Sequence, residues 1–231
     1  MFSRIRAIWA IIELGITIPI CIFFMYIFRK KHRTVRRIWA KMQPFLLGFS
    51  IKQKGQVAPN AQLLLLNHQS MLDIVLIEAL HPGDPCWVAK EEITNIPIYG
   101  HIMHPPKMIS INRSDRRSMV KLIKSAKNRI DEGRTIAIFP EGTRSSGDKL
   151  LKFQTGAKAL AEKLNLTVQP AVIVGSRAIL DSKNLISKWG EVRVVFLEPV
   201  SPRDDPDWFE KIKSQMERIL EDELANPPRN W

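Results

Sequence analysis

The feature that most constrains this chain is one long apolar run near the N-terminus, followed at once by a dense basic flank. Residues 7–28 are apolar apart from the interruptions at Glu13 and Pro19, and about 20 such residues cross a bilayer as a helix. Seven Lys/Arg lie between residues 29 and 41, against two before residue 7. The pattern predicts a membrane-associated helical segment, transmembrane or interfacial, over residues 1–49.

Two modes of membrane attachment fit this run. Its length suits a simple transmembrane anchor, whereas Glu13 and Pro19 favour a re-entrant or interfacial hairpin. No cleavage site of small residues follows it, so we expect the segment to stay on the protein. The positive charge beyond the run predicts, by the positive-inside rule, that the rest of the chain faces the cytoplasm. The expected location is the cell inner membrane, with the catalytic domain on its cytoplasmic side.

A second helical pattern follows. Apolar residues recur at helical spacing between residues 35 and 49, and Arg36, Arg37 and Lys41 occupy the other side. The apolar face either rests on anionic lipid or packs on its own domain, because periodicity does not say what covers it. Pro44 predicts a break or kink within this helix, since proline has no N–H to donate.

The net charge of +12 is concentrated at the N-terminus, where residues 1–41 carry +8. Because this charge surrounds the apolar segment instead of forming a stripe on the core, we expect no nucleic-acid partner. The two cysteines, Cys21 and Cys86, form neither a disulfide framework nor a metal-ligand cluster. We therefore expect a reducing compartment, no metal site and no cofactor.

From residue 50 onward, short apolar runs alternate with helical patterns. This predicts one α/β domain over residues 50–225, with a mostly parallel or mixed sheet flanked by helices. Residues 226–231 contain Pro227 and Pro228 and are expected to be a frayed tail. Strands are predicted at residues 62–66, 86–89, 108–111, 135–139, 168–174 and 191–197, and helices at 71–80, 116–132, 155–164 and 208–224.

The first chemical signal follows a strand of four leucines. In Asn67-His68-Gln69-Ser70-Met71-Leu72-Asp73 a histidine precedes an aspartate by five residues, which suggests an oriented general base. On a regular helix this offset turns the two side chains about 140° apart, so they meet only if His68 lies on the strand-to-helix loop. Alone, an HxxxxD pattern arises readily by chance.

The second signal, Phe139-Pro140-Glu141-Gly142-Thr143-Arg144-Ser145, also follows an apolar strand. Gly142 permits a tight turn. Arg144 and Thr143 suit a phosphate, because a guanidinium binds phosphate oxygens as a fork and open α/β sheets bind ligands beyond the carboxyl ends of their strands. Taken alone, the string is equally well a surface turn.

Together, NHQSMLD and FPEGTRS, in this order and about seventy residues apart, resemble the glycerolipid acyltransferase family, and most closely the bacterial 1-acyl-sn-glycerol-3-phosphate acyltransferases. The resemblance covers about residues 50–200. It implies that His68 and Asp73 are the catalytic pair. It also implies a substrate phosphate site, which carries onto Glu141, Gly142, Thr143 and Arg144.

Two further positions follow from the resemblance. Met108-Ile109-Ser110-Ile111-Asn112-Arg113 is similar to a family block that ends in a phosphate-binding arginine, which implies that role for Arg113. The glycine usual about six residues earlier is replaced by Lys107, which puts the conformation of that loop in question. Lys90 resembles a family position near the site, although a solvated lysine fits equally well.

The resemblance implies a reaction. A fatty acyl group passes from acyl-CoA or acyl carrier protein to the sn-2 hydroxyl of 1-acyl-sn-glycerol-3-phosphate, giving phosphatidic acid in phospholipid biosynthesis at the bilayer. His68 would take the proton of the hydroxyl, held by Asp73, so no protein nucleophile is required. Alternatives are another lysolipid acceptor, a thioester hydrolase, or a non-catalytic membrane lipid-binding protein of the same fold.

Overall fold

The computed structural model describes residues 2–112, 115 and 117–227. Within them, seven strands form one sheet in the order β1-β7-β6-β2-β5-β3-β4. The strands are β1 (Phe49–Lys54), β2 (Leu63–Leu66), β3 (Pro85–Lys90), β4 (Ile109–Ile111), β5 (Thr135–Ile138), β6 (Val168–Val174) and β7 (Gly190–Phe196). All neighbours pair in parallel except β6 and β7. The predicted mixed α/β sheet is confirmed.

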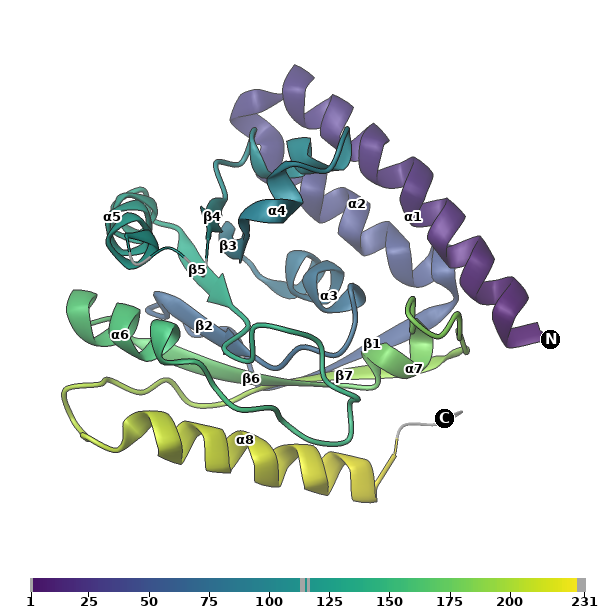
Figure 1. Cartoon of the computed structure of the whole chain (residues 1–231). Coiled ribbons are helices and arrows are strands. Elements are labelled where there is room, and N and C mark those ends of the chain that lie inside the picture. The colour runs from purple at the N-terminus through teal and green to yellow at the C-terminus, as the bar shows by residue number, and fades with distance from the viewer. Residues whose placement is uncertain (1, 113–114, 116, 228–231) are drawn as a thin grey trace.

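Helices cover both faces of this sheet (Figure 1). One face is covered by α5 (Ser118–Asp131), α6 (Thr155–Leu164) and α8 (Trp208–Ala225), and the other by α1 (Phe2–Ile27), α2 (His32–Leu47), α3 (Leu72–Leu80) and α7 (Ser176–Ile179). Short helices η1 (Arg29–Lys31), α4 (Glu91–Thr94) and η2 (Tyr99–Met103) complete the fold. Strand β2 is buried on both sides, because Leu63 and Leu65 face one layer and Leu64 and Leu66 the other.

The predicted strands and long helices are present within one or two residues of their expected bounds, and β6 and α6 match throughout. Strand β1 was missed, because its sequence Phe49–Lys54 alternates lysine and glutamine with only two apolar residues. As an edge strand it buries one face alone, so the pattern carries little hydrophobic signal. Residues 228–231 of the predicted tail lie outside the described residues.

The N-terminal helix α1 lies along the domain instead of projecting from it (Figure 1). Arg6 donates to the carbonyl of Leu47 at 2.9 Å, the Tyr99 hydroxyl donates to the carbonyl of Gly15 at 2.8 Å, and Tyr26 bonds His101 at 2.8 Å. These contacts fasten its start, middle and end. Glu13, which interrupts the apolar run, is turned inward, where Gln43 donates to it at 2.9 Å.

The opposite side of α1 is apolar and exposed. Phe2–Ile27 is the one helix in the described chain that is long and apolar enough to cross a membrane. Its exposed side chains recur at helical spacing, which gives one continuous apolar stripe. The exposed apolar residues of α1 and the turn after it are Phe2, Ile5, Ile8, Trp9, Ile11, Ile12, Ile16, Ile20, Phe23, Phe24, Ile27 and Phe28.

Helix α2 differs from the sequence prediction in two ways. It continues through Pro44 to Leu47, so the predicted break is wrong, although Pro44 has no N–H to donate within the helix. Arg36, predicted on the polar outer side, is buried at 3% exposure, while Ile38 and Phe45 are exposed. One face of α2 packs on the domain, and its apolar residues divide between that interface and the surface.

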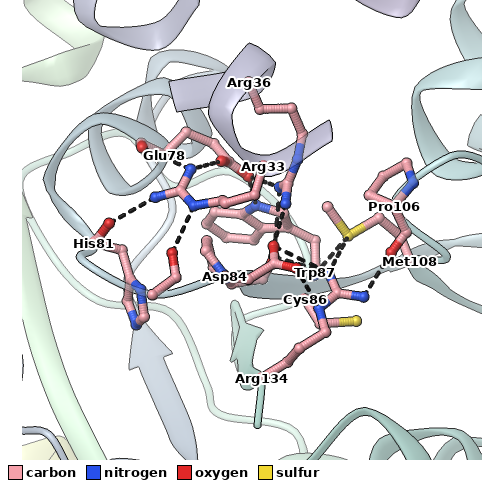
Figure 2. Close-up of polar contacts among 12 residues, drawn as sticks. Arg33, Arg36, Glu78, His81, Asp84, Cys86, Trp87, Pro106, Met108 and Arg134 are labelled. Carbon is pink, nitrogen blue, oxygen red and sulfur yellow. Dashed lines mark hydrogen bonds and ion pairs between the residues drawn. The ribbon is translucent and has the colours of Figure 1, made fainter. Parts of the chain in front are cut away.

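A buried charge cluster explains the position of Arg36 (Figure 2). Its guanidinium pairs with Glu78 of α3 and with Asp84. Arg33 pairs with Glu78 at 2.6 Å, and Arg134 pairs with Asp84 at 2.9 Å. Since a buried charge is tolerated only with a partner, these ion pairs fix α2 against α3 and against the starts of β3 and β5.

Candidate active site

The site residues gather at one edge of the sheet because their strands are parallel neighbours. His68 follows β2 and Glu141 follows β5, and these two strands pair directly. Ser176 follows β6, which pairs with β2 on the other side. Parallel strands bring their carboxyl ends to the same edge, where α/β sheets bind ligands. Motifs some seventy residues apart in sequence are therefore joined here.

His68 and Asp73 meet as predicted. His68 lies on the loop before α3, and its Nδ1 is 2.7 Å from the Asp73 Oδ2. The carboxylate is fully buried, while the imidazole is 16% exposed. A carboxylate oxygen can only accept, so in the neutral imidazole Nδ1 carries the proton and Nε2 keeps its lone pair. No described residue hydrogen-bonds Nε2, which leaves it able to accept a proton from a substrate.

Asp73 is itself held by three other donors. The backbone N–H groups of Gln69 and Ser70 donate to the same Oδ2 at 2.6 and 2.9 Å, and the Ser176 hydroxyl donates to Oδ1. The loop therefore wraps around the Asp73 carboxylate, which cannot rotate without losing several hydrogen bonds. The ring of His68 is fixed in turn.

Glu141 joins the two motif loops. Its Oε1 accepts the backbone N–H of His68 at 2.8 Å, and its Oε2 accepts that of Leu151 at 2.7 Å. The backbone N–H of Ser145 also donates to the carbonyl of His68 at 2.7 Å. Burial raises the pKa of Glu141, and the two N–H donors oppose that shift. Both carboxylate oxygens serve the protein, so Glu141 positions the loops instead of facing a ligand.

An aromatic stack forms the wall beside the imidazole. The Phe139 ring lies 3.9 Å from the His68 ring at 11°, and Trp87 stacks behind Phe139 at 5.3 Å. Phe139 also lines a cavity of about 360 Å³ that opens between the strand ends and helices α5 and α6. Its apolar lining includes Val88, Ile111, Met119, Leu122 and Ile138. A cavity with many apolar side chains in its lining thus begins at the ring that stacks on the partly exposed imidazole.

The other predicted site residues lie on the same edge. Gly142 has a φ of 72°, the left-handed conformation that favours glycine. Thr143 and Arg144 are exposed beyond it, and Arg144 donates to the Ser182 hydroxyl at 3.1 Å. Lys90 is exposed at the end of β3. Arg113 lies outside the described residues, and the described residues contain no group of three or more potential metal ligands.

Sequence reasoning missed several residues that build this site. Ser176 holds Asp73, and Arg177 donates to the carbonyl of Ser145 at 2.6 Å and pairs with Asp181 at 2.8 Å. Asn67 exchanges two hydrogen bonds with Ile173, at 2.9 and 2.6 Å, and so extends the β2–β6 pairing by side chain. The only sequence signal for Ser176 and Arg177 is their position just after a buried strand.

Comparison with known proteins gives the family. The model of the family described as Acyltransferase matches residues 48–174. A 1-acyl-sn-glycerol-3-phosphate acyltransferase of Helicobacter pylori is 39% identical, over 94% of this chain and 92% of its own. A chloroplastic 1-acyl-sn-glycerol-3-phosphate acyltransferase of Arabidopsis thaliana is 30% identical, over 86% of this chain and 60% of its own length.

A solved structure shares the fold. The crystal structure of the 1-acyl-sn-glycerophosphate acyltransferase PlsC from Thermotoga maritima superposes with a TM-score of 0.77 at 22% identity, over 96% of both chains. The family model spans more than half of this chain, and the Helicobacter pylori relative aligns along nearly all of it. The chain belongs to the acyltransferase family.

Proposed function

We propose that this protein transfers a fatty acyl group from an acyl thioester to the sn-2 hydroxyl of 1-acyl-sn-glycerol-3-phosphate, forming phosphatidic acid in phospholipid biosynthesis. The observation that carries the proposal is His68, held by the buried Asp73 with its second nitrogen unengaged among the described residues. The names of the relatives support the acceptor. Acyl-CoA and acyl carrier protein are both candidate donors.

The reaction needs a base and no protein nucleophile. Nε2 of His68 takes the proton of the acceptor hydroxyl as its oxygen bonds to the thioester carbonyl carbon. Asp73 stabilises the imidazolium that forms. When the carbon–sulfur bond breaks, the imidazolium returns the proton to the departing thiolate. Ser70, two residues from His68, is buried and donates its hydroxyl to the carbonyl of Leu180 at 2.7 Å, so it serves the loop.

We assign the acceptor phosphate to the exposed residues at the same edge. Arg144 and Thr143 follow the Gly142 turn, and Arg113 follows β4 in sequence. Lys90 pairs in register with Ile111 at the end of β4, two residues before Arg113. Guanidinium groups bind phosphate oxygens in pairs, which suits a doubly charged phosphomonoester.

The apolar cavity beside Phe139 is our candidate for the acyl chain. It is lined by apolar side chains of β3, β4, β5 and α5, and it begins at the ring that stacks on His68. An acyl chain seated there brings its carbonyl end toward the imidazole. Burial of methylene groups supplies about 0.8 kcal/mol each, so this cavity would provide much of the binding energy.

The position of α1 favours attachment to one face of the membrane. A helix fastened to the domain at Arg6, Gly15 and Tyr26 cannot cross a bilayer alone, because the domain would have to enter with it. Its exposed apolar stripe instead suits an interfacial helix. We place the protein on the cytoplasmic side of the inner membrane, where the basic turn that follows α1 would meet the anionic lipids of that leaflet.

The test is an acceptor panel with the full chain in detergent. Labelled acyl-CoA is offered with lysophosphatidate, with monoacylglycerol, with lyso-ornithine lipid, or without acceptor. The third acceptor enters because a lyso-ornithine lipid O-acyltransferase of Rhizobium meliloti is 29% identical over 68% of this chain and 56% of its own. Lysophosphatidate should be preferred. Preference for lyso-ornithine lipid would transfer the proposal to that acceptor, and thiol release without acceptor would indicate a hydrolase.

His68→Ala tests the mechanism. We expect about a 100- to 10,000-fold loss of kcat, the contribution of a positioned base, with an unchanged circular-dichroism spectrum. Because the ring is partly exposed and its removal leaves Asp73 with its backbone donors, the fold should survive. A variant that kept wild-type kcat would exclude His68 as the base.

A further inference from the structure

A second cavity, of about 660 Å³ and lined by charged residues, lies at the end of the sheet opposite the candidate active site. Its lining includes Asp84, directly before β3, and Arg134, directly before β5, whereas the candidate active site lies at the carboxyl ends of the strands. The length of strand β5 by itself, four residues at about 3.3 Å each, places the cavity and the candidate active site roughly 13 Å apart. The cavity is therefore a separate site.

The lining carries excess positive charge. Five described cations face two carboxylates, and two of the five are neutralised: Arg134 by Asp84 at 2.9 Å and Arg129 by Glu132 at 2.7 Å. The other three have no acidic partner within the described part of the chain, and all three are exposed at the rim: Arg29, Lys30 and Lys107. Three cations without a described acidic partner around one cavity attract an anion.

The wall that carries Lys107 is fixed. Arg134 donates to the carbonyl of Pro106 at 2.6 Å, and the Lys107 N–H donates to the carbonyl of His104 at 3.0 Å. Lys107 has a φ of 49°, a left-handed conformation that a lysine adopts at an energetic cost and that glycine adopts freely. This lysine in a left-handed conformation lines the cavity, where a glycine would supply no charge.

The cavity also adjoins the apolar stripe of α1. That stripe ends at Ile27 and Phe28, which are exposed, and the next two residues, Arg29 and Lys30, line the cavity. A molecule bound here meets cations at one end and exposed apolar side chains at the other. This is the chemistry of a phospholipid, with a phosphate headgroup and acyl chains, and a free phosphate would use only half of it.

We infer that this basic cavity, formed by the α1–α2 turn, the loop of residues 104–107 and the end of α5, binds the phosphate headgroup of an anionic membrane phospholipid. The lipid is a bound membrane component, distinct from the acceptor at the His68 edge. Its acyl chains follow the exposed side of α1. The site fixes the orientation of the protein on the membrane, because the headgroup position is set by residues of three elements.

The test uses the full chain in a non-ionic detergent, titrated calorimetrically with dihexanoyl phosphatidylglycerol. We expect saturable binding, about ten-fold weaker in Lys30→Gln and in Lys107→Gly, the loss of one charge-assisted hydrogen bond each. Dihexanoyl phosphatidylcholine should bind more weakly. Lys107→Gly relieves the strained backbone, so its melting temperature should equal or exceed the wild-type value, which separates lost binding from lost folding.

Three controls make the test decisive. Lys31→Gln and Lys41→Gln remove exposed charges from the same basic segment without touching the cavity, so they should leave the Kd within about two-fold; equal effects would mean diffuse attraction and overturn the site. Arg144→Gln should leave the Kd unchanged, and a loss there would place the lipid at the proposed acceptor site instead. Inorganic phosphate binding as tightly as the lipid would overturn the lipid assignment.

Discussion

Replacing Asp73 by asparagine separates the charge of this residue from its shape. In the Ser-His-Asp triad the same substitution forces the wrong histidine tautomer, which costs about 10,000-fold in kcat. Here the Oδ2 that accepts His68 Nδ1 also accepts two backbone N–H groups, at 2.6 and 2.9 Å. An NH₂ group in that position would face three donors. The amide oxygen should therefore stay there, and the nitrogen should face Ser176, whose hydroxyl can accept.

The expected loss follows from this orientation. The productive tautomer of His68 is retained, and only the charge that stabilises the imidazolium is removed. Hydrogen bonds to charged groups contribute about 1.5–3 kcal/mol and neutral ones about 0.5–1.5 kcal/mol. The like limits of these ranges differ by about 1–1.5 kcal/mol, which corresponds to a loss of kcat of roughly 5- to 10-fold. Stability should change little, since all four hydrogen bonds of Asp73 have a counterpart.

The assay is thiol release from acyl-CoA with saturating lysophosphatidate, alongside thermal unfolding. Asp73→Ala is the comparison, because it leaves two backbone N–H groups and the Ser176 hydroxyl buried without an acceptor, at about 1–3 kcal/mol each. It should lose both activity and stability. A loss near 10,000-fold in Asp73→Asn would show that the amide turns, and a loss below about three-fold would show that Asp73 has no electrostatic role.

Three other predictions concern charge. Arg144→Lys should raise KM for lysophosphatidate and leave KM for acyl-CoA unchanged, because the fork is lost while the charge remains; equal changes for both substrates would refute the assignment. Glu78→Gln should lower the free energy of unfolding by about 3 kcal/mol, since Arg33 loses its carboxylate partner and the buried Arg36 loses one of its two, whereas exposed Glu198→Gln should not. Burial lowers the pKa of His81 from 6.5 to about 4. Between these values the unfolded chain binds a proton that the folded protein excludes, so lowering the pH from 7 to 4.5 should destabilise wild type by about 2.5 kcal/mol more than His81→Gln; parallel pH profiles would contradict this.

The sequence alone determined the class of fold and predicted the pairing of His68 with Asp73. Four consecutive leucines and the run from Val168 to Val174, apolar except for Gln169, are long enough and regular enough to identify buried strands. His68 and Asp73 lie five residues apart, so the conformation of the short loop between them decides whether their side chains meet. Such short-range features need no knowledge of the rest of the chain.

What covers each surface was decided only by the tertiary structure. The helical pattern of α2 placed Arg36 outside and the apolar residues inside, yet Arg36 is buried on Glu78 and Asp84 while Phe45 is 89% exposed. A period of 3.6 residues identifies two faces of a helix without saying which one meets the domain.

The same limit applies to the residues of the site. Glu141 was grouped with the phosphate residues, but its two oxygens accept the backbone N–H groups of His68 and Leu151, which lie 73 and 10 residues away in sequence. Ser176 reaches Asp73 across more than a hundred residues, because β6 and β2 are neighbours in the sheet. The order of strands brings these groups together, and a linear sequence determines that order through long-range packing that no local pattern contains.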